Sequence, residues 1–193
     1  MRMDKSSLAG MVLSLGAITV IAATVLAVVY RLTAAPIEEA QRQKQVEAIR
    51  QVTPPFDNDP IAEAVTMDDG TTVYPARKGG TLVGAAVESY SDKGFSGNIS
   101  VMYGFDTDGT VTGYAVLSHA ETPGLGAKIE EWFADPQGHR SVIGKNPATT
   151  SMYVTKDHGG DIDAITAATI TSRAFLDALR RAHNSFNTYR NAQ

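Results

Sequence analysis

The chain has 193 residues, with 17 basic and 21 acidic side chains that give a formal net charge of −4. This balance, with no stripe of Lys and Arg interleaved with aromatic residues, argues against nucleic acid as a partner. The absence of cysteine excludes disulfides, a thiol nucleophile and Cys-ligated iron–sulfur clusters. The four histidines are scattered without a short ligand spacing, so no metal site is expected.

The first element is an uncharged run of 23 residues from Leu8 to Tyr30, rich in Leu, Ile, Val and Ala. A helix needs about 20 such residues to cross the hydrocarbon layer, whereas the apolar region of a cleaved signal peptide is usually about 7 to 15 residues long. Length therefore favours an uncleaved anchor, with residues 1–31 as the N-terminal segment and transmembrane helix. Basic residues flank the run on both sides, so their count leaves the orientation open.

A helical stalk is expected over residues 32–55. Pro36 lies where a helix would begin, and Ile37 to Val52 is rich in good helix formers. Apolar residues are sparse in that stretch, which predicts a solvated helix that touches the following domain only near its end. Thr53-Pro54-Pro55 would stop the helix.

Strands are expected next, because β-branched residues gather in short runs separated by turn residues. Asp106-Thr107-Asp108-Gly109 is a strong hairpin signal between two of these runs. A further short strand is possible at Ser151–Thr155. The four main predicted strands are Thr72–Arg77, Thr81–Tyr90, Asn98–Phe105 and Thr110–Ser118.

Two helices complete the predicted domain. The first is short, from Ala127 to Ala134, and the second runs from about Thr169 to Tyr189. Strands followed by helices without regular alternation predict an α+β domain over residues 56–193, with a largely antiparallel sheet and flanking helices. One face of the last helix is expected to be buried, through Phe175, Leu179, Ala182 and Phe186.

The junction before the last helix, Asp163 to Ser172, combines small side chains with three threonines. Small residues let another group approach the backbone, and the first turn of a helix offers unpaired N–H groups to an anion such as phosphate. A threonine here would most simply cap the helix. The same geometry suits a threonine esterified to a phosphate group.

A second unusual stretch runs from His119 to Gly126 and contains Glu121-Thr122-Pro123-Gly124-Leu125-Gly126. Pro-Gly-x-Gly is an ordinary turn, and Glu121 would then be a solvated acid. The alternative is a loop, stiffened by its proline, whose glycines approach a flat ligand.

Together, and in this order after an N-terminal span, the two stretches resemble the FMN-binding domain family. Its members include the G subunit of the Rnf electron-transport complex and the C subunit of the sodium-translocating NADH:quinone reductase. The family signature is Asp, two residues, Ser or Thr, Gly, Ala, Thr, and it matches here at Asp163, Thr166, Ala168 and Thr169. Ala167 stands where glycine is typical, which loses backbone freedom if the position needs a positive φ.

The resemblance implies that FMN is attached covalently to Thr169, through a phosphoester bond installed by a flavin transferase. It also implies that Asp163 takes part in recognition by the transferase. No catalytic acid, base or nucleophile is expected, because the flavin supplies the redox chemistry. The other residues expected to bind the cofactor are Glu121, Thr122, Gly124, Leu125, Gly126, Thr166, Ala168 and Thr171.

Chain length favours the Rnf member of this family over the quinone reductase member. The resemblance then implies a single-pass protein of the inner membrane whose domain lies on the periplasmic or outer face. Its partners would be the other membrane and peripheral subunits of an Rnf-type complex, which couples electron flow between ferredoxin and NAD to ion translocation. The alternatives are the C subunit of the quinone reductase, a cofactor-free anchored binding domain, and an anchored hydrolase, for which no Gly-x-Ser-x-Gly motif is present.

Overall fold

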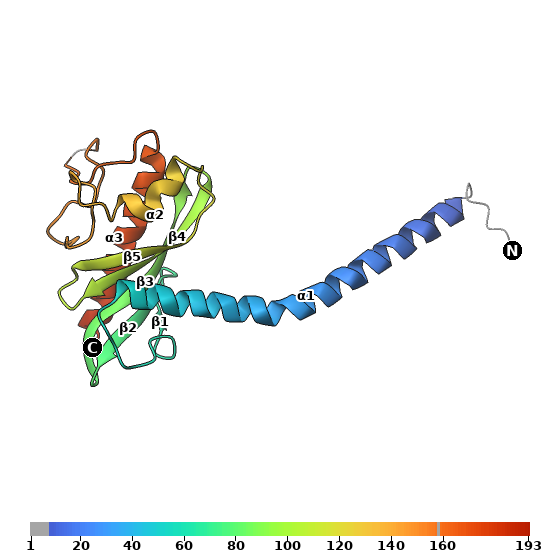
Figure 1. The fold of residues 1–193 in the computed structure, drawn as a ribbon, viewed down its shortest axis with the longest axis horizontal. Helices are drawn as coiled ribbons and strands as arrows, with labels where there is room; N and C mark the ends of the chain where they lie inside the picture. The colour runs from blue at the N-terminus through green and yellow to red at the C-terminus, as the bar shows by residue number, and fades with distance from the viewer. Residues whose placement is uncertain (1–7, 158) are drawn as a thin grey trace. The chain divides into compact units, whose positions relative to one another are not determined.

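The computed structural model describes residues 8–157 and 159–193. The chain divides into two compact units, Met1–Gln45 and Val46–Gln193 (Figure 1). Helix α1 (Leu8–Val52) contributes to both. The final turns of the predicted stalk therefore belong to the C-terminal unit.

In the first unit, α1 is long and apolar enough to cross a membrane, with a mean hydropathy of 2.6 in its most apolar part. Its apolar side chains face outward, as Leu26, 72% exposed, illustrates. A separate helix beginning at Pro36 is a wrong prediction, because Pro36 lies inside the continuous α1. An internal proline removes one backbone hydrogen bond. The Ala, Glu and Gln residues on either side favour the helix strongly enough to continue it.

The second unit is built on a five-stranded sheet in which each strand pairs antiparallel with the next along the chain. This meander confirms the predicted α+β class. The strands are β1 (Val65–Thr66), β2 (Thr72–Lys78), β3 (Thr81–Gly94), β4 (Gly97–Asp106) and β5 (Val111–Ser118).

Two hairpins join the three longest strands. The β4–β5 turn lies where it was predicted, and one Asp106 carboxylate oxygen accepts the N–H groups of Asp108 and Thr110 at 2.9 and 2.8 Å. The β3–β4 hairpin extends beyond the predicted strand ends, to a tip formed by Phe95 and Ser96. The polar residues near the end of β3 resemble a loop in sequence. They remain in the strand because Ser91 donates a hydrogen bond to Asp177 of the last helix.

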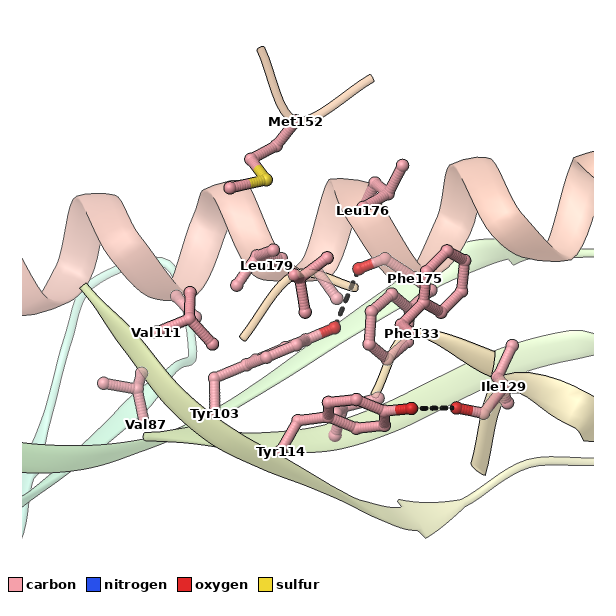
Figure 2. Packing of buried hydrophobic residues seen from close by; sticks show 14 of the residues in the cluster. Val87, Tyr103, Val111, Tyr114, Ile129, Phe133, Met152, Phe175, Leu176 and Leu179 are labelled. Carbon is pink, nitrogen blue, oxygen red and sulfur yellow. Dashed lines mark hydrogen bonds between the residues drawn. The ribbon is translucent and has the colours of Figure 1, made fainter. Parts of the chain in front are cut away.

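Helix α3 (Thr169–Asn191) covers one face of the sheet with the predicted apolar stripe (Figure 2). Phe175 stacks on Phe133 with ring centroids 4.3 Å apart. The Tyr103 hydroxyl donates to the Phe175 carbonyl at 2.7 Å, and the Tyr114 hydroxyl donates to the Ile129 carbonyl at 2.9 Å. All of these side chains are buried, so α3 is fixed to the sheet along its length.

The opposite face of the sheet receives the end of α1, as predicted for the end of the stalk. Ile49 and Val52 are 0% and 1% exposed and belong to a second apolar cluster with residues of β2, β3 and β4. Gly104 and Gly113, which pair across β4 and β5, leave room for this helix end. A Cβ atom on Gly104 would lie 1.8 Å from the Val52 carbonyl oxygen.

The segment between β5 and α3 is mostly irregular. The predicted helix is shorter than expected and consists of the 3-10 turn η1 (Gly126–Lys128) and α2 (Ile129–Trp132). The predicted strand Ser151–Thr155 is wrong, since this stretch forms only one isolated bridge, between Val154 and Ile162. The backbone of this stretch forms local hydrogen bonds instead. The Tyr153 N–H donates to the Ser151 carbonyl, and the Ile162 N–H donates to the Tyr153 carbonyl.

Candidate functional site

A pocket of about 330 Å³ lies at the N-terminal end of α3. Ligand pockets typically have volumes of about 300 to 1,000 Å³. Three segments form the walls: the tip of the β3–β4 hairpin, the loop after β5 and the first turn of α3. The lining residues are Phe95, Glu121, Thr122, Leu125, Gly126, Ala167, Ala168, Thr169, Ile170 and Thr171.

The fold therefore brings together the two stretches that the sequence singled out. Of the predicted site residues, the pocket wall contains Glu121, Thr122, Leu125, Gly126, Ala168, Thr169 and Thr171. Gly124, Thr166 and Asp163 do not line it. Gly124 has a φ of 75° and shapes the turn, and Thr166 is exposed next to the lining residue Ala167.

Glu121 connects the three walls. It is only 5% exposed, which rules out the alternative of a solvated acid. One carboxyl oxygen accepts the Ser96 N–H at 3.0 Å, and the other accepts the Thr171 hydroxyl at 2.6 Å. The Glu121 N–H donates to the His119 ring at 3.1 Å. Glu121 thus links the hairpin tip and α3 through the loop that carries it.

Gly126 makes this contact possible. A Cβ atom there would lie 2.6 Å from a Glu121 carboxyl oxygen and 2.8 Å from the Thr171 hydroxyl oxygen. Such distances are shorter than van der Waals contact, so no larger residue fits without movement. The space left by Gly126 is therefore used by two side chains of the protein.

The two threonines in the first turn of α3 differ in their environment. Thr171 is 1% exposed, and its hydroxyl is committed to Glu121. Thr169 is half-buried, and its hydroxyl has no hydrogen-bond partner within residues 8–157 and 159–193. Ala168 occupies the N-cap position without a side-chain bond, so Thr169 does not cap the helix. The pocket extends around the first turn of α3 and includes both residues.

The start of α3 also presents backbone donors. The first N–H group within α3 that donates to a backbone carbonyl one turn earlier is that of Ser172, which donates to the Ala168 carbonyl at 3.0 Å. In the described chain, the N–H groups of Thr169, Ile170 and Thr171 precede it without such a partner. The first turn of this 23-residue helix has no acidic residue of its own, although the Glu121 carboxylate accepts the Thr171 hydroxyl there. These backbone N–H groups are suited to bind an anion.

Ala167 adopts a φ of 62°, the only positive value among non-glycine residues of the described chain. It is the third residue of a turn closed by a 3.0 Å hydrogen bond from the Ala168 N–H to the Ile165 carbonyl. A positive φ at this turn position favours glycine. The position therefore needs the positive φ for which glycine is typical in the family, and Ala167 is strained there.

Asp163 lies outside the pocket and fixes the loop that leads to it. One carboxylate oxygen accepts the His139 N–H at 3.1 Å. The Trp132 indole N–H donates to the Asp163 carbonyl at 2.9 Å. These bonds give Asp163 a structural role. Its role in transferase recognition stays a prediction.

Three pocket residues, Phe95, Ala167 and Ile170, were not predicted from the sequence to bind the cofactor. Phe95 is 69% exposed at the hairpin tip, and Ile170 is 49% exposed on the first turn of α3. An exposed aromatic residue in the Gly94-Phe95-Ser96-Gly97 turn was the available signal. Residue 95 was not predicted to lie near the site because residues 91–97 fell outside the predicted strands.

A helix long and apolar enough to span a membrane, followed by an α+β domain with a pocket at a helix N-terminus, is the architecture of a membrane-anchored ligand-binding protein. Residues 94–184 match the family model of the FMN-binding domain, and residues 3–52 match the RnfG N-terminal region. The chain belongs to the family formed by the G subunits of ion-translocating oxidoreductase complexes, which confirms the resemblance seen in the sequence.

Relatives named as the G subunit of such a complex are similar over most of their length. The protein of Stutzerimonas stutzeri is 37% identical over 178 residues, covering 88% of this chain and 77% of the relative. The protein of Aliivibrio fischeri is 36% identical over 201 residues, covering 97% and 91%. The protein of Methanosarcina acetivorans is 35% identical over 185 residues, covering 93% and 94%.

Proposed function

We propose that this chain is the FMN-carrying electron-transfer subunit of an ion-translocating oxidoreductase complex of the Rnf type. The observation that carries the proposal is the pocket at the start of α3, where the two motifs of the FMN-binding family meet. Its partners are the other membrane and peripheral subunits of the complex, and the electron flow is between ferredoxin and NAD. The relatives, named as subunits of such a complex, support this role.

The residues present fit FMN in two respects. The free N–H groups at the start of α3 suit its phosphate. The exposed apolar side chains of Phe95, Leu125 and Ile170 suit the flat isoalloxazine ring. FMN supplies the redox chemistry, and the protein supplies position and electrostatics.

We further propose that FMN is bound covalently through the Thr169 hydroxyl. Thr171 is a poor acceptor because its hydroxyl is buried and bonded to Glu121, and Thr166 lies outside the pocket. The Thr169 oxygen would form a bond to the flavin phosphate and lose its proton to solvent. A flavin transferase would supply the flavin as a dinucleotide, whose pyrophosphate bond breaks and releases a nucleoside monophosphate.

In-gel fluorescence tests this proposal. The full chain, coexpressed with a flavin transferase and denatured, is expected to fluoresce yellow-green under ultraviolet light. Thr169→Ala should abolish the fluorescence and leave the protein folded, while Thr166→Ala, the control, should retain it. A dark wild-type band, also from the native host, would favour a cofactor-free binding domain instead.

We also infer that α1 is an uncleaved span of the inner membrane and that the domain after Arg31 lies on its periplasmic or outer face. The apolar length of α1 and the family membership support this topology. Protease added to intact spheroplasts should digest the C-terminal domain. Full protection of that domain, under conditions that cleave a known periplasmic protein, would reverse the orientation.

A further inference from the structure

Glu121 places a buried carboxyl group in the pocket wall, with no cationic partner among residues 8–157 and 159–193. The residue is 5% exposed, and its two oxygens accept hydrogen bonds from Ser96 and Thr171. Across the described ranges, none of the ion pairs between basic and acidic side chains includes Glu121. Because the Ser96 N–H can only donate and the Thr171 hydroxyl donates as well, the pattern is that of an ionised carboxylate.

The position of this carboxylate is fixed on both sides. A Cβ atom on Gly94 would lie 2.7 Å from one Glu121 oxygen, and a Cβ atom on Gly126 would lie 2.6 Å from the other. Glycines at both positions therefore allow the group to sit in the wall of the pocket. A charge held in such a partly desolvated site is weakly screened by water and salt.

We propose that Glu121 lowers the reduction potential of the flavin in this pocket, by holding one uncompensated negative charge in its wall. The inference rests on the proposed function. A flavin that takes up two electrons and one proton gains one negative charge. A nearby carboxylate disfavours that gain, so the oxidised form is stabilised relative to the reduced form. Glu121 acts here as a positioning and electrostatic residue, and it transfers no proton or electron itself.

Glu121→Gln isolates the charge, because the amide preserves both hydrogen bonds. Its oxygen can accept the Ser96 N–H, and its NH₂ group can donate to the Thr171 hydroxyl. In the flavin-loaded full chain, we expect the equilibrium constant for two-electron reduction to rise about tenfold, which corresponds to a midpoint potential higher by about 30 mV. The shift should persist at high ionic strength, and the unfolding temperature should stay close to that of the wild type.

Glu130→Gln is the matched control. It removes the same charge from a nearby side chain that is 67% exposed, pairs with His119 and does not line the pocket. Its midpoint potential should equal that of the wild type. A Glu121→Gln protein that carries flavin with an unchanged potential would overturn the proposal.

Thr171→Val provides a second test if Glu121→Gln fails to take up flavin. The variant removes a hydrogen-bond donor that partly neutralises the Glu121 carboxylate, so the midpoint potential should fall. An unchanged midpoint potential would also overturn the proposal. Loss of flavin from both variants, with normal folding, would assign Glu121 and Thr171 to flavin loading rather than to the potential. A wild-type protein without flavin would instead contradict the proposed function.

Discussion

Ala167 shows at the scale of one residue how the site departs from its preferred backbone. Its φ of 62° is a left-handed backbone conformation. This conformation brings Cβ close to the following carbonyl oxygen and costs an L-residue other than glycine roughly 1 to 2 kcal/mol. The strain lies in the turn directly before Thr169, the proposed attachment residue. The same turn is closed by the bond between Ala168 and Ile165, which keeps it in place.

Ala167→Gly should therefore stabilise the protein. Relief of the strain exceeds the entropy that glycine adds to the unfolded chain, so we expect a net gain of about 0.5 to 1 kcal/mol in the free energy of unfolding. Denaturant unfolding of the full chain in detergent measures it. Ala168→Gly is the control, because Ala168 has a φ of −134° and should lose stability. A loss of stability in Ala167→Gly would show that the turn is not strained.

His183 carries a residue-scale prediction on pH. Burial beside the sheet, with the positive charge of Arg190 as a second cause, lowers the pKa of this histidine below 6.5. The unfolded chain then binds the proton more readily than the folded one. The free energy of unfolding should fall as the pH drops below about 6.5, the ordinary histidine value.

Unfolding of the full chain at pH 7.5 and pH 5 measures this effect. His183→Gln should show a smaller difference between the two pH values than the wild type, because the titrating group is gone. A variant with an undiminished pH dependence would show that another histidine or carboxyl group is responsible.

The contact of α1 with the sheet is the element-scale feature on which the domain's attachment depends. Gly104 on β4 and Gly113 on β5 form a flat area beneath Val52. The Thr112 hydroxyl donates a hydrogen bond to the Val52 carbonyl. The end of α1 thus covers the part of the sheet where Gly104 and Gly113 have no side chains.

Gly104→Ala should destabilise the C-terminal unit by about 1 to 3 kcal/mol, as is usual when a well-packed contact is overfilled. The added methyl group would meet backbone, which cannot turn away. Gly113→Ala is a matched control with a milder expected effect, since its Cβ atom would lie 3.3 Å from the Val52 Cα. Thermal unfolding measures both. Equal stability of the two variants would mean that α1 does not pack closely at Gly104.

At the scale of the whole molecule, the parts predicted well from sequence are those with local signals. Runs of β-branched residues between turn residues located most of the sheet, the Asp106–Gly109 turn located one hairpin, and helical periodicity located α3. Continuity of α1 through Pro36 was missed because the proline signal is local, whereas the helix is maintained by the residues around it. The end of the β3–β4 hairpin was missed because its polar residues are stabilised by partners on α3, far away in the chain.

The site divides in the same way. The motifs at Glu121–Gly126 and Asp163–Thr169 were found from sequence, but their meeting in one pocket depends on the fold. The buried position of Glu121 and the free hydroxyl of Thr169 could not be read from residue type, since both depend on contacts between segments. Phe95 was missed because it enters the pocket from a third segment.

Peptide mass spectrometry of the full chain coexpressed with a flavin transferase tests the central claim most directly. We predict one FMN per chain, with the added mass on Thr169 and none on Thr166 or Thr171. The hydroxyl of Thr171 is bonded to Glu121, and that of Thr166 lies outside the pocket. FMN mass on either of those threonines, or on no residue at all, would contradict the account.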